Sequence, residues 1–180
     1  MRVVAAFLIL TWGVVSACAP THNVFPSRAM EGIDHNFDFA KWHVRADGSE
    51  SKKVQLGGAI LQSTASGGTV TIVVAQLPIV ERPAYGPKEN GKNNGQFAIT
   101  FQGQVESAML QTGNRVMVVG MTHPREVVTV NDLSRSFPIV EAHCLHFWNT
   151  QGRSIADFPF YEAGYVPLIQ ETVCASAPAR

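Results

Sequence analysis

One short segment carries most of the side chains that could do chemistry, and it reads EAHCLH at residues 141–146. On an extended strand Cys144 and His146 would lie on the same face, next to Trp148. Thiolate and imidazole groups both bind zinc and copper, so these two residues could hold one metal ion together. A closed site would also need ligands from distant parts of the chain, for example His35, His43 or His123.

The same residues allow other interpretations. Cys144 could be a nucleophile that His146 activates, provided that its thiol is free. Alternatively, His146 is a half-buried histidine held by hydrogen bonds, and Cys144 either forms a disulfide bond with Cys174 or remains a buried thiol. A disulfide would close a loop of about 30 residues, which the chain-entropy model values at about 3–4 kcal/mol. We favour the disulfide and expect no metal ion at Cys144 and His146.

The sequence contains no G-x-S-x-G nucleophile elbow, no H-E-x-x-H zinc motif and no Walker loop. Its glycine pairs at residues 57–58 and 67–68 do not match a dinucleotide fingerprint. A bend in a strand and a hairpin turn explain these two pairs better. We therefore predict that the protein is not an enzyme.

The N-terminus predicts export from the cytoplasm. A cationic start at residues 1–2 precedes an apolar run at residues 3–15, which is interrupted only by Thr11. The run is shorter than the roughly 20 residues that a membrane-spanning helix needs. It leads into VSAC at residues 15–18, which resembles the processing site of bacterial lipoproteins. This resemblance implies a signal peptide at residues 1–17 and a mature chain that begins at Cys18.

The lipoprotein resemblance also implies acyl chains, palmitate among them, on Cys18, and this covalent lipid would be the only cofactor. One acyl chain binds a membrane weakly, whereas two or three hold a protein firmly. Ala19 stands where an inner-membrane retention signal would usually place an aspartate. By this analogy we expect the protein in the outer membrane of a Gram-negative bacterium, lipid-anchored and facing the periplasm.

Composition and charge narrow the range of partners. Removing residues 1–17 takes away Arg2, and 13 basic residues against 14 acidic residues leave the mature chain with a net charge of −1. A nearly neutral chain lacks the basic surface that nucleic acids require, so we expect no nucleic-acid partner. A basic edge toward anionic lipid or polysaccharide could still form from a few lysines, although such lysines often only solvate loops and sheet edges. These lysines are Lys52, Lys53, Lys88 and Lys92.

The hydrophobic pattern predicts strands from residue 54 onward, with turn signals between them. We expect strands at residues 54–61, 69–77, 96–101, 115–121, 127–130 and 137–148, a bulge or bend at Gly57 and Gly58, and a long loop at residues 79–95. We also expect a short helix over residues 33–42 capped by Asp34, a helical turn at residues 105–110, and a tail from residue 157 that packs across the barrel. Phe158, Phe160, Tyr161 and Tyr165 would anchor that tail.

The number and spacing of these strands predict a mainly β protein, a small OB-like antiparallel β-barrel with a short helix. It would follow a signal peptide and a tether. The division that we expect is a signal peptide at residues 1–17, a lipidated tether at residues 18–30, a single β-barrel domain at residues 31–174 and a frayed tail at residues 175–180.

Several short motifs recur in an order that resembles one family. After the VSAC segment they read VQLGGAI at residues 54–60, QLP at 76–78, GQF at 95–97, GNR at 113–115, VVG at 118–120, FPIV at 137–140 and LHFW at 145–148. The chain is thereby similar to the Slp family of bacterial outer-membrane lipoproteins, named for starvation-inducible members. The resemblance implies a role in stress or stationary phase, with no established catalysis and no defined ligand. The loop at residues 88–94 and the cysteine pair depart from its best-known members.

Our leading hypothesis is therefore a non-enzymatic lipoprotein anchored in the outer membrane. It would serve envelope integrity or the response to stress and starvation by contacting envelope proteins or polysaccharides. The alternative hypothesis is an envelope metal-binding module that uses Cys144 and His146. A weak hydrolase with Cys144 as its nucleophile is a third hypothesis.

Overall fold

The computed structural model describes residues 24–46, 50–81, 85–92, 94–130, 132–153, 160–161 and 166–175. Cys18 and the signal peptide lie outside these residues, as do Phe158 and Tyr165 of the expected tail and the side chains of Phe160 and Tyr161. Within the described part of the chain, no helix is long and apolar enough to cross a membrane.

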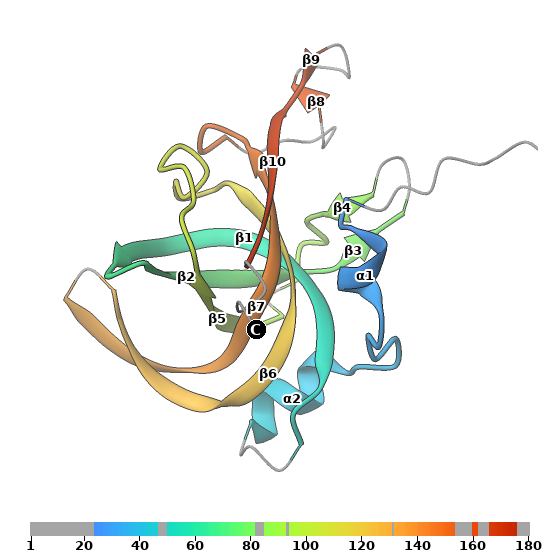
Figure 1. Cartoon of the computed structure of the whole chain (residues 1–180), viewed down its shortest axis with the longest axis vertical. Helices are drawn as coiled ribbons and strands as arrows, with labels where there is room; N and C mark the ends of the chain where they lie inside the picture. The colour runs from blue at the N-terminus through green and yellow to red at the C-terminus, as the bar shows by residue number, and fades with distance from the viewer. Residues whose placement is uncertain are drawn as a thin grey trace, which may run out of the picture.

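Long strands form a closed ring (Figure 1). Its members are β1 (Lys53–Ser66), β2 (Thr69–Leu77), β5 (Gln96–Gln102), β6 (Arg115–Val130) and β7 (Leu133–Asn149). The order is β7-β5-β2-β1-β6, and β6 pairs again with β7 to close the ring. The mainly β, OB-like fold predicted from the strand pattern is thus confirmed.

One pair of strands departs from the predicted antiparallel arrangement. Ala98 to Phe101 of β5 pair in parallel with Ile139 to Ala142 of β7, whereas every other neighbouring pair in the ring is antiparallel. A ring with an odd number of strands cannot alternate direction at every junction. A closed ring made of these strands must therefore contain at least one parallel pair.

The inside of the ring holds the main hydrophobic core. Members of this core alternate along β2, β5 and the start of β6, as expected where one face of a strand points inward. Phe97, Ile99 and Phe101 of β5 face Leu145 and Phe147 of β7 within this cluster. The other members from the ring strands are Val54, Leu56, Ile60, Val70, Ile72, Val74, Val116, Val118, Val140 and Ala142.

The N-terminal helices differ from the predicted one. The structure has α1 at Ser27–Met30 and α2 at Phe39–Arg45, and Asp38 caps α2 by accepting the Lys41 N–H. Asp34 instead accepts the Asn36 N–H at 2.9 Å, and this turn keeps residues 34–36 out of the helix. Phe39 and Trp42 of α2 pack against the core of the ring.

Two predictions about strand irregularities are corrected. Residues 115–121 and 127–130 do not form two strands, because β6 runs through Arg115–Val130 with a register shift between His123 and Arg125. The shift accommodates Pro124, which cannot donate a ladder hydrogen bond. The bulge in β1 lies between Ile60 and Gln62 rather than at the glycine pair.

Gly58 allows β1 and β2 to lie close together. A Cβ at Gly58 would stand 2.2 Å from the carbonyl oxygen of Ala75, so only glycine lets β1 and β2 approach this closely. The predicted hairpin turn is present at Gly67 and Gly68, with φ angles of +60° and +81°. A turn of this kind needs positive φ, which glycine adopts without steric cost.

Smaller elements lie outside the ring. The loop at residues 79–95 contains β3 (Ile79–Val80) paired with β4 (Gly86–Pro87), and Glu89 forms an ion pair with the buried Arg115 of β6. β10 (Ile169–Cys174) extends the sheet beside β7, while β8 (Phe160–Tyr161) pairs with β9 (Val166–Pro167). The C-terminal segment therefore reaches the ring as an added strand.

The described part of the expected tether packs on the domain. Phe25 is only 4% exposed, and it contacts an outer cluster that contains Met117, Val119 and Trp148. Ala29 and Met30 of α1 pack against the same cluster. Residues 24–30 are thus part of the folded domain in this structure.

Candidate functional site

β7 places Cys144, His146 and Trp148 together on the outer face of the ring, because alternate residues of a strand share a face. The alternating neighbours Leu145 and Phe147 point into the core. In the structure Cys144 is joined to Cys174 by a disulfide bond. These two cysteines are direct partners in the β7–β10 ladder.

His146 is buried and enclosed by polar and aromatic neighbours. Its Nδ1 lies 2.6 Å from the Thr172 hydroxyl, and its Nε2 lies 3.2 Å from Oε1 of Gln170. The rings of Trp148 and Phe25 pack edge-on against it, with centroid distances of 4.2 and 6.3 Å. Burial lowers the pKa of His146 to about 4, although the hydrogen bond with Gln170 acts in the opposite direction.

This arrangement disfavours both a reactive thiol at Cys144 and metal binding by Cys144 and His146. The sulfur is in a disulfide, and both ring nitrogens of the histidine face hydrogen-bonding partners. The distant histidines do not join them: His123 pairs with Glu141 at 3.0 Å, and the His43 ring lies against Gly95. Among the described residues, no group of three or more His, Cys, Asp or Glu side chains is placed to hold a metal ion.

A surface cleft of about 320 Å³ lies elsewhere, between α2, the turn before it, the segment that precedes β1 and the bulged part of β6. Its lining combines aromatic, charged and amide side chains. The lining residues are Asn36, Phe37, Asp38, Lys41, Trp42, Arg45, Ala46, Glu50, Lys52 and His123. We call this feature the α2 cleft.

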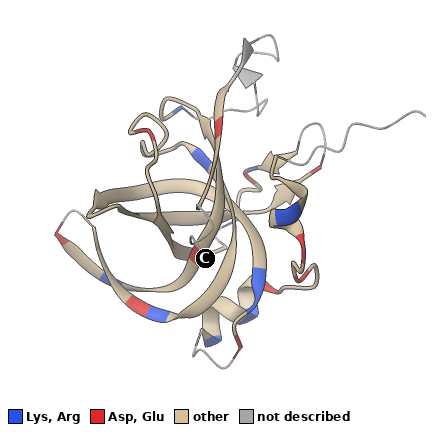
Figure 2. Cartoon of the chain, viewed as in Figure 1, with Lys and Arg blue, Asp and Glu red and all other residues tan. Residues whose placement is uncertain are grey.

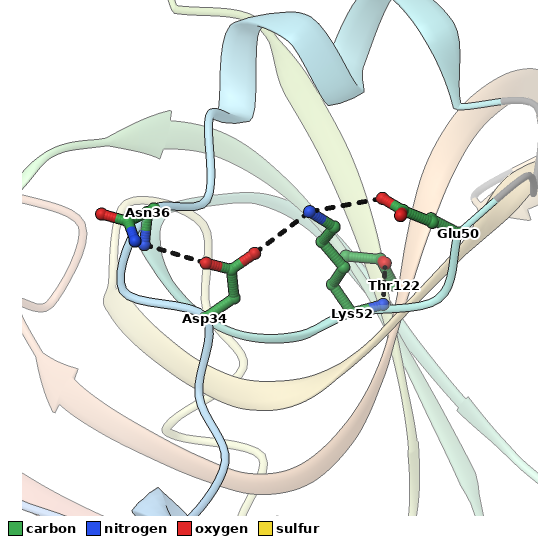
Figure 3. A network of polar contacts seen from close by, with 5 residues as sticks. All are labelled: Asp34, Asn36, Glu50, Lys52 and Thr122. Carbon is green, nitrogen blue, oxygen red and sulfur yellow. Dashed lines mark hydrogen bonds and ion pairs between the residues drawn. The ribbon is translucent and has the colours of Figure 1, made fainter.

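A polar network surrounds Lys52, one of the residues that line the α2 cleft (Figure 3). The Lys52 ammonium lies 3.2 Å from Asp34 and 3.3 Å from Glu50. The Lys52 backbone N–H donates to the Thr122 hydroxyl at 2.9 Å, and the Thr122 N–H donates to the Lys52 carbonyl at 2.9 Å. The network therefore ties the turn at Asp34 to β6 and to the segment that precedes β1.

Hydrogen bonding in this network shifts the pKa values of its charged groups. The Asn36 N–H, followed by Lys52, holds the pKa of Asp34 below its usual value. The hydrogen bonds of Lys52 with Asp34 and Glu50 raise the pKa of Lys52. Both groups consequently stay charged near neutral pH.

One face of α2 forms a wall of the cleft. The N-cap Asp38 lies three and four residues before Lys41 and Trp42, and Arg45 lies four and three residues after them, so the four side chains lie on one side of the helix. The Lys41 ammonium lies 3.3 Å from the Asp38 carboxylate. The Trp42 ring is held between the rings of Phe37 and Phe39, at centroid distances of 5.6 and 5.7 Å. Arg45 has no ion-pair partner within the described part of the chain.

The basic edge considered from the sequence is not a free cationic surface at Lys52 and Lys53. Lys52 is neutralised as described above, and the Lys53 ammonium donates to the Glu31 carbonyl at 2.6 Å. Basic and acidic residues are interspersed along the chain rather than gathered on one element (Figure 2). No sequence motif marks the α2 cleft, although Asp38, Trp42 and Arg45 stand at helical spacing in the sequence.

One comparison with known proteins identifies a family for the chain. The family model described as the outer membrane lipoprotein Slp family matches residues 15–173, a range that includes the VSAC segment. The chain therefore belongs to the Slp family of outer-membrane lipoproteins. No curated protein and no solved structure matches the chain.

Proposed function

We propose that the mature protein is a non-catalytic domain, held at the periplasmic side of the outer membrane by acyl chains on Cys18. It contributes to envelope integrity and to the response to stress and starvation through contacts with envelope proteins or polymers. Membership of an outer-membrane lipoprotein family supports the location. The role in stress and the choice of partner are our proposal.

The strongest support for this proposal is that the N-terminal segment packs on the domain from Val24 onward. The Thr172 hydroxyl lies 3.2 Å from the Val24 carbonyl oxygen, and the adjacent Phe25 is buried. Only residues 19–23 separate Val24 from Cys18. Even fully extended, this stretch spans about 20 Å. A lipid on Cys18 would thus hold the face formed by α1 and β10 close to the membrane.

The state of the reactive residues supports a non-catalytic role. Cys144 and His146 are engaged in a disulfide and in hydrogen bonds that attach β10 and the N-terminal segment to the ring. A nucleophile or general base needs a free, accessible group of suitable pKa. His146, with its low pKa, is a poor general base near neutral pH.

Paramagnetic broadening by membrane lipids tests this orientation. The mature lipoprotein is placed in nanodiscs that contain a gadolinium-chelating lipid, and the backbone amide signals are compared with those in unlabelled discs. We expect stronger broadening at Ala29 and Thr172 than at Val130 and Leu133, which lie at the far end of the β6–β7 hairpin (Figure 1). Equal broadening at all four amides, or stronger broadening at the hairpin, would contradict the short tether.

A lengthened tether supplies the control. Inserting about 20 Gly and Ser residues after Ala19 lets the domain move away from the bilayer while leaving its fold unchanged. The difference in broadening between α1 and the hairpin should then decrease. Digestion by an added protease in intact and in permeabilised cells tests the periplasmic side. Protection only in intact cells is expected, and digestion in intact cells would place the domain outside.

A further inference from the structure

We propose that the α2 cleft binds an acidic sugar unit, a pyranose ring that carries a carboxylate, within an envelope polysaccharide. The proposal rests on the envelope location proposed above, which brings such polymers within reach. It identifies the chemistry that the domain recognises.

The size and lining of the α2 cleft suit a sugar ring. Its volume of about 320 Å³ lies at the small end of the range for ligand sites, which usually combine apolar walls with a few polar groups. Phe37 and Trp42 provide the apolar part, and the contacts of Trp42 with Phe37 and Phe39 keep its ring in place. A rigid aromatic side chain offers contact area at a low cost in conformational entropy.

The charges of the α2 cleft favour a single carboxylate. Lys41 is paired with Asp38, and Lys52 is paired with Glu50 and with Asp34. Arg45 is the basic lining residue that has no ion-pair partner within the described part of the chain. Its planar guanidinium can bind a carboxylate through two parallel hydrogen bonds.

Hydrogen-bonding groups for sugar hydroxyls line the same cleft. Figure 3 shows Asn36 and Glu50 on opposite sides of the Asp34–Lys52 ion pair. The Asn36 amide offers both donors and an acceptor, and the Glu50 carboxylate is an acceptor. An acidic peptide would use the cation but would leave this mixture of donors and acceptors largely unused, and a nucleic acid would need a larger basic surplus.

A titration with two matched disaccharides tests the proposal. The acidic probe is N-acetylglucosaminyl-N-acetylmuramic acid, and the neutral probe is di-N-acetylchitobiose, which lacks the carboxylate-bearing lactyl group. Binding to the mature lipoprotein in detergent is followed by the indole N–H signals of Trp42 and Trp148. We expect the Trp42 signal to shift, the buried Trp148 signal to remain in place, and the acidic probe to bind at least tenfold more tightly.

Arg45→Gln removes the unpaired cation at an exposed position, so the fold should persist, and we expect the tenfold preference for the acidic probe to disappear. Lys92→Gln removes one charge from an exposed residue outside the cleft and should leave the preference unchanged. Equal affinity for both probes, a Trp42 signal that does not shift, or an undiminished preference in Arg45→Gln would overturn the proposal. The titration does not depend on the location of the protein, so its failure would leave the proposed lipid anchor untouched.

Discussion

The Thr172 hydroxyl and the Val24 carbonyl oxygen lie 3.2 Å apart and join two segments that are 148 positions apart in the chain. If this hydroxyl donates to Val24, it accepts from Nδ1 of His146, which lies 2.6 Å away. A neutral His146 with its proton on Nδ1 can only accept at Nε2, so it bonds Gln170 only when that side-chain amide is flipped to place its N–H where the structure has Oε1, 3.2 Å away. The low pKa of His146 agrees with such a neutral ring.

Replacing Phe25 by alanine tests whether the N-terminal segment belongs to the domain. Phe25 is 4% exposed, and Phe→Ala at a buried position typically costs about 3–5 kcal/mol in the free energy of unfolding. Urea denaturation of the mature protein, without a reducing agent, measures this loss. Val44 is 80% exposed, so Val44→Ala should change the free energy of unfolding by less than about 0.5 kcal/mol. Similar effects of the two substitutions would show that residues 24–30 do not contribute to the folded domain.

The Cys144–Cys174 bond should stabilise the domain by restricting the unfolded chain. It joins residues separated by 30 positions, a loop for which the chain-entropy model gives about 3.5 kcal/mol. We expect the double variant Cys144→Ala, Cys174→Ala to lose this amount in urea denaturation. Wild-type protein unfolded with a reducing agent should lose a similar amount. A wild-type transition that is unchanged by reduction would argue against a disulfide in the isolated protein.

Burial of His146 should make the fold less stable in acid. The pKa is about 4 in the folded state against about 6.5 in the unfolded chain, so between these values the unfolded chain binds a proton that the fold excludes. The free energy of unfolding therefore falls as the pH decreases from 6.5 to 4, by at most about 1.4 kcal/mol per pH unit from this group. Above pH 6.5 the group contributes no slope.

The variant His146→Gln isolates this contribution, because glutamine does not titrate. Urea denaturation at several values between pH 4 and 7 should give a shallower decline for the variant than for the wild type. Parallel declines would mean that other groups account for the acid sensitivity of the fold.

Gly120 should be intolerant of any side chain. A Cβ at this position would stand 2.1 Å from the Glu141 carbonyl oxygen, at the register shift between Val119 and Gly120. Gly120→Ala must push β6 and β7 apart where the ring closes, and we expect a loss of at least about 2 kcal/mol. Val127→Ala on the same strand is the control, since Val127 is 72% exposed. Thermal unfolding followed by circular dichroism compares the two, and equal midpoints would contradict the close approach.

The strands of the ring were predictable because each carries a strong local pattern. In TVTIVVAQL at residues 69–77 the apolar content and the flanking turn signals suffice to identify β2 (Thr69–Leu77). The continuity of β6 was not predictable, since Pro124 normally ends a strand and only the bulge opposite β7 accommodates it. The helix was misplaced because Asp34 and Asp38 are both possible caps, and tertiary contacts with Lys52 assign Asp34 to a turn.

For the candidate sites, too, features set by local sequence were predictable, and features that depend on distant contacts were not. The strand pattern predicted that Cys144 and His146 share one face, and the structure places them on one face. It could not indicate that Val24 and Phe25 would cover them, because that contact depends on a segment far away in the chain. The α2 cleft was missed for a similar reason, since Arg45 and Lys52 meet only once α2 has packed on the ring.

The most direct test of the account is the intact mass of the protein extracted with detergent from the membranes of a bacterial host, with and without reduction. The account predicts a chain that begins at Cys18 and carries acyl chains, with a mass that rises by two hydrogen atoms on reduction. A soluble chain with an unmodified Cys18 would contradict the lipid anchor. It would also remove the short tether on which the proposed position at the membrane depends.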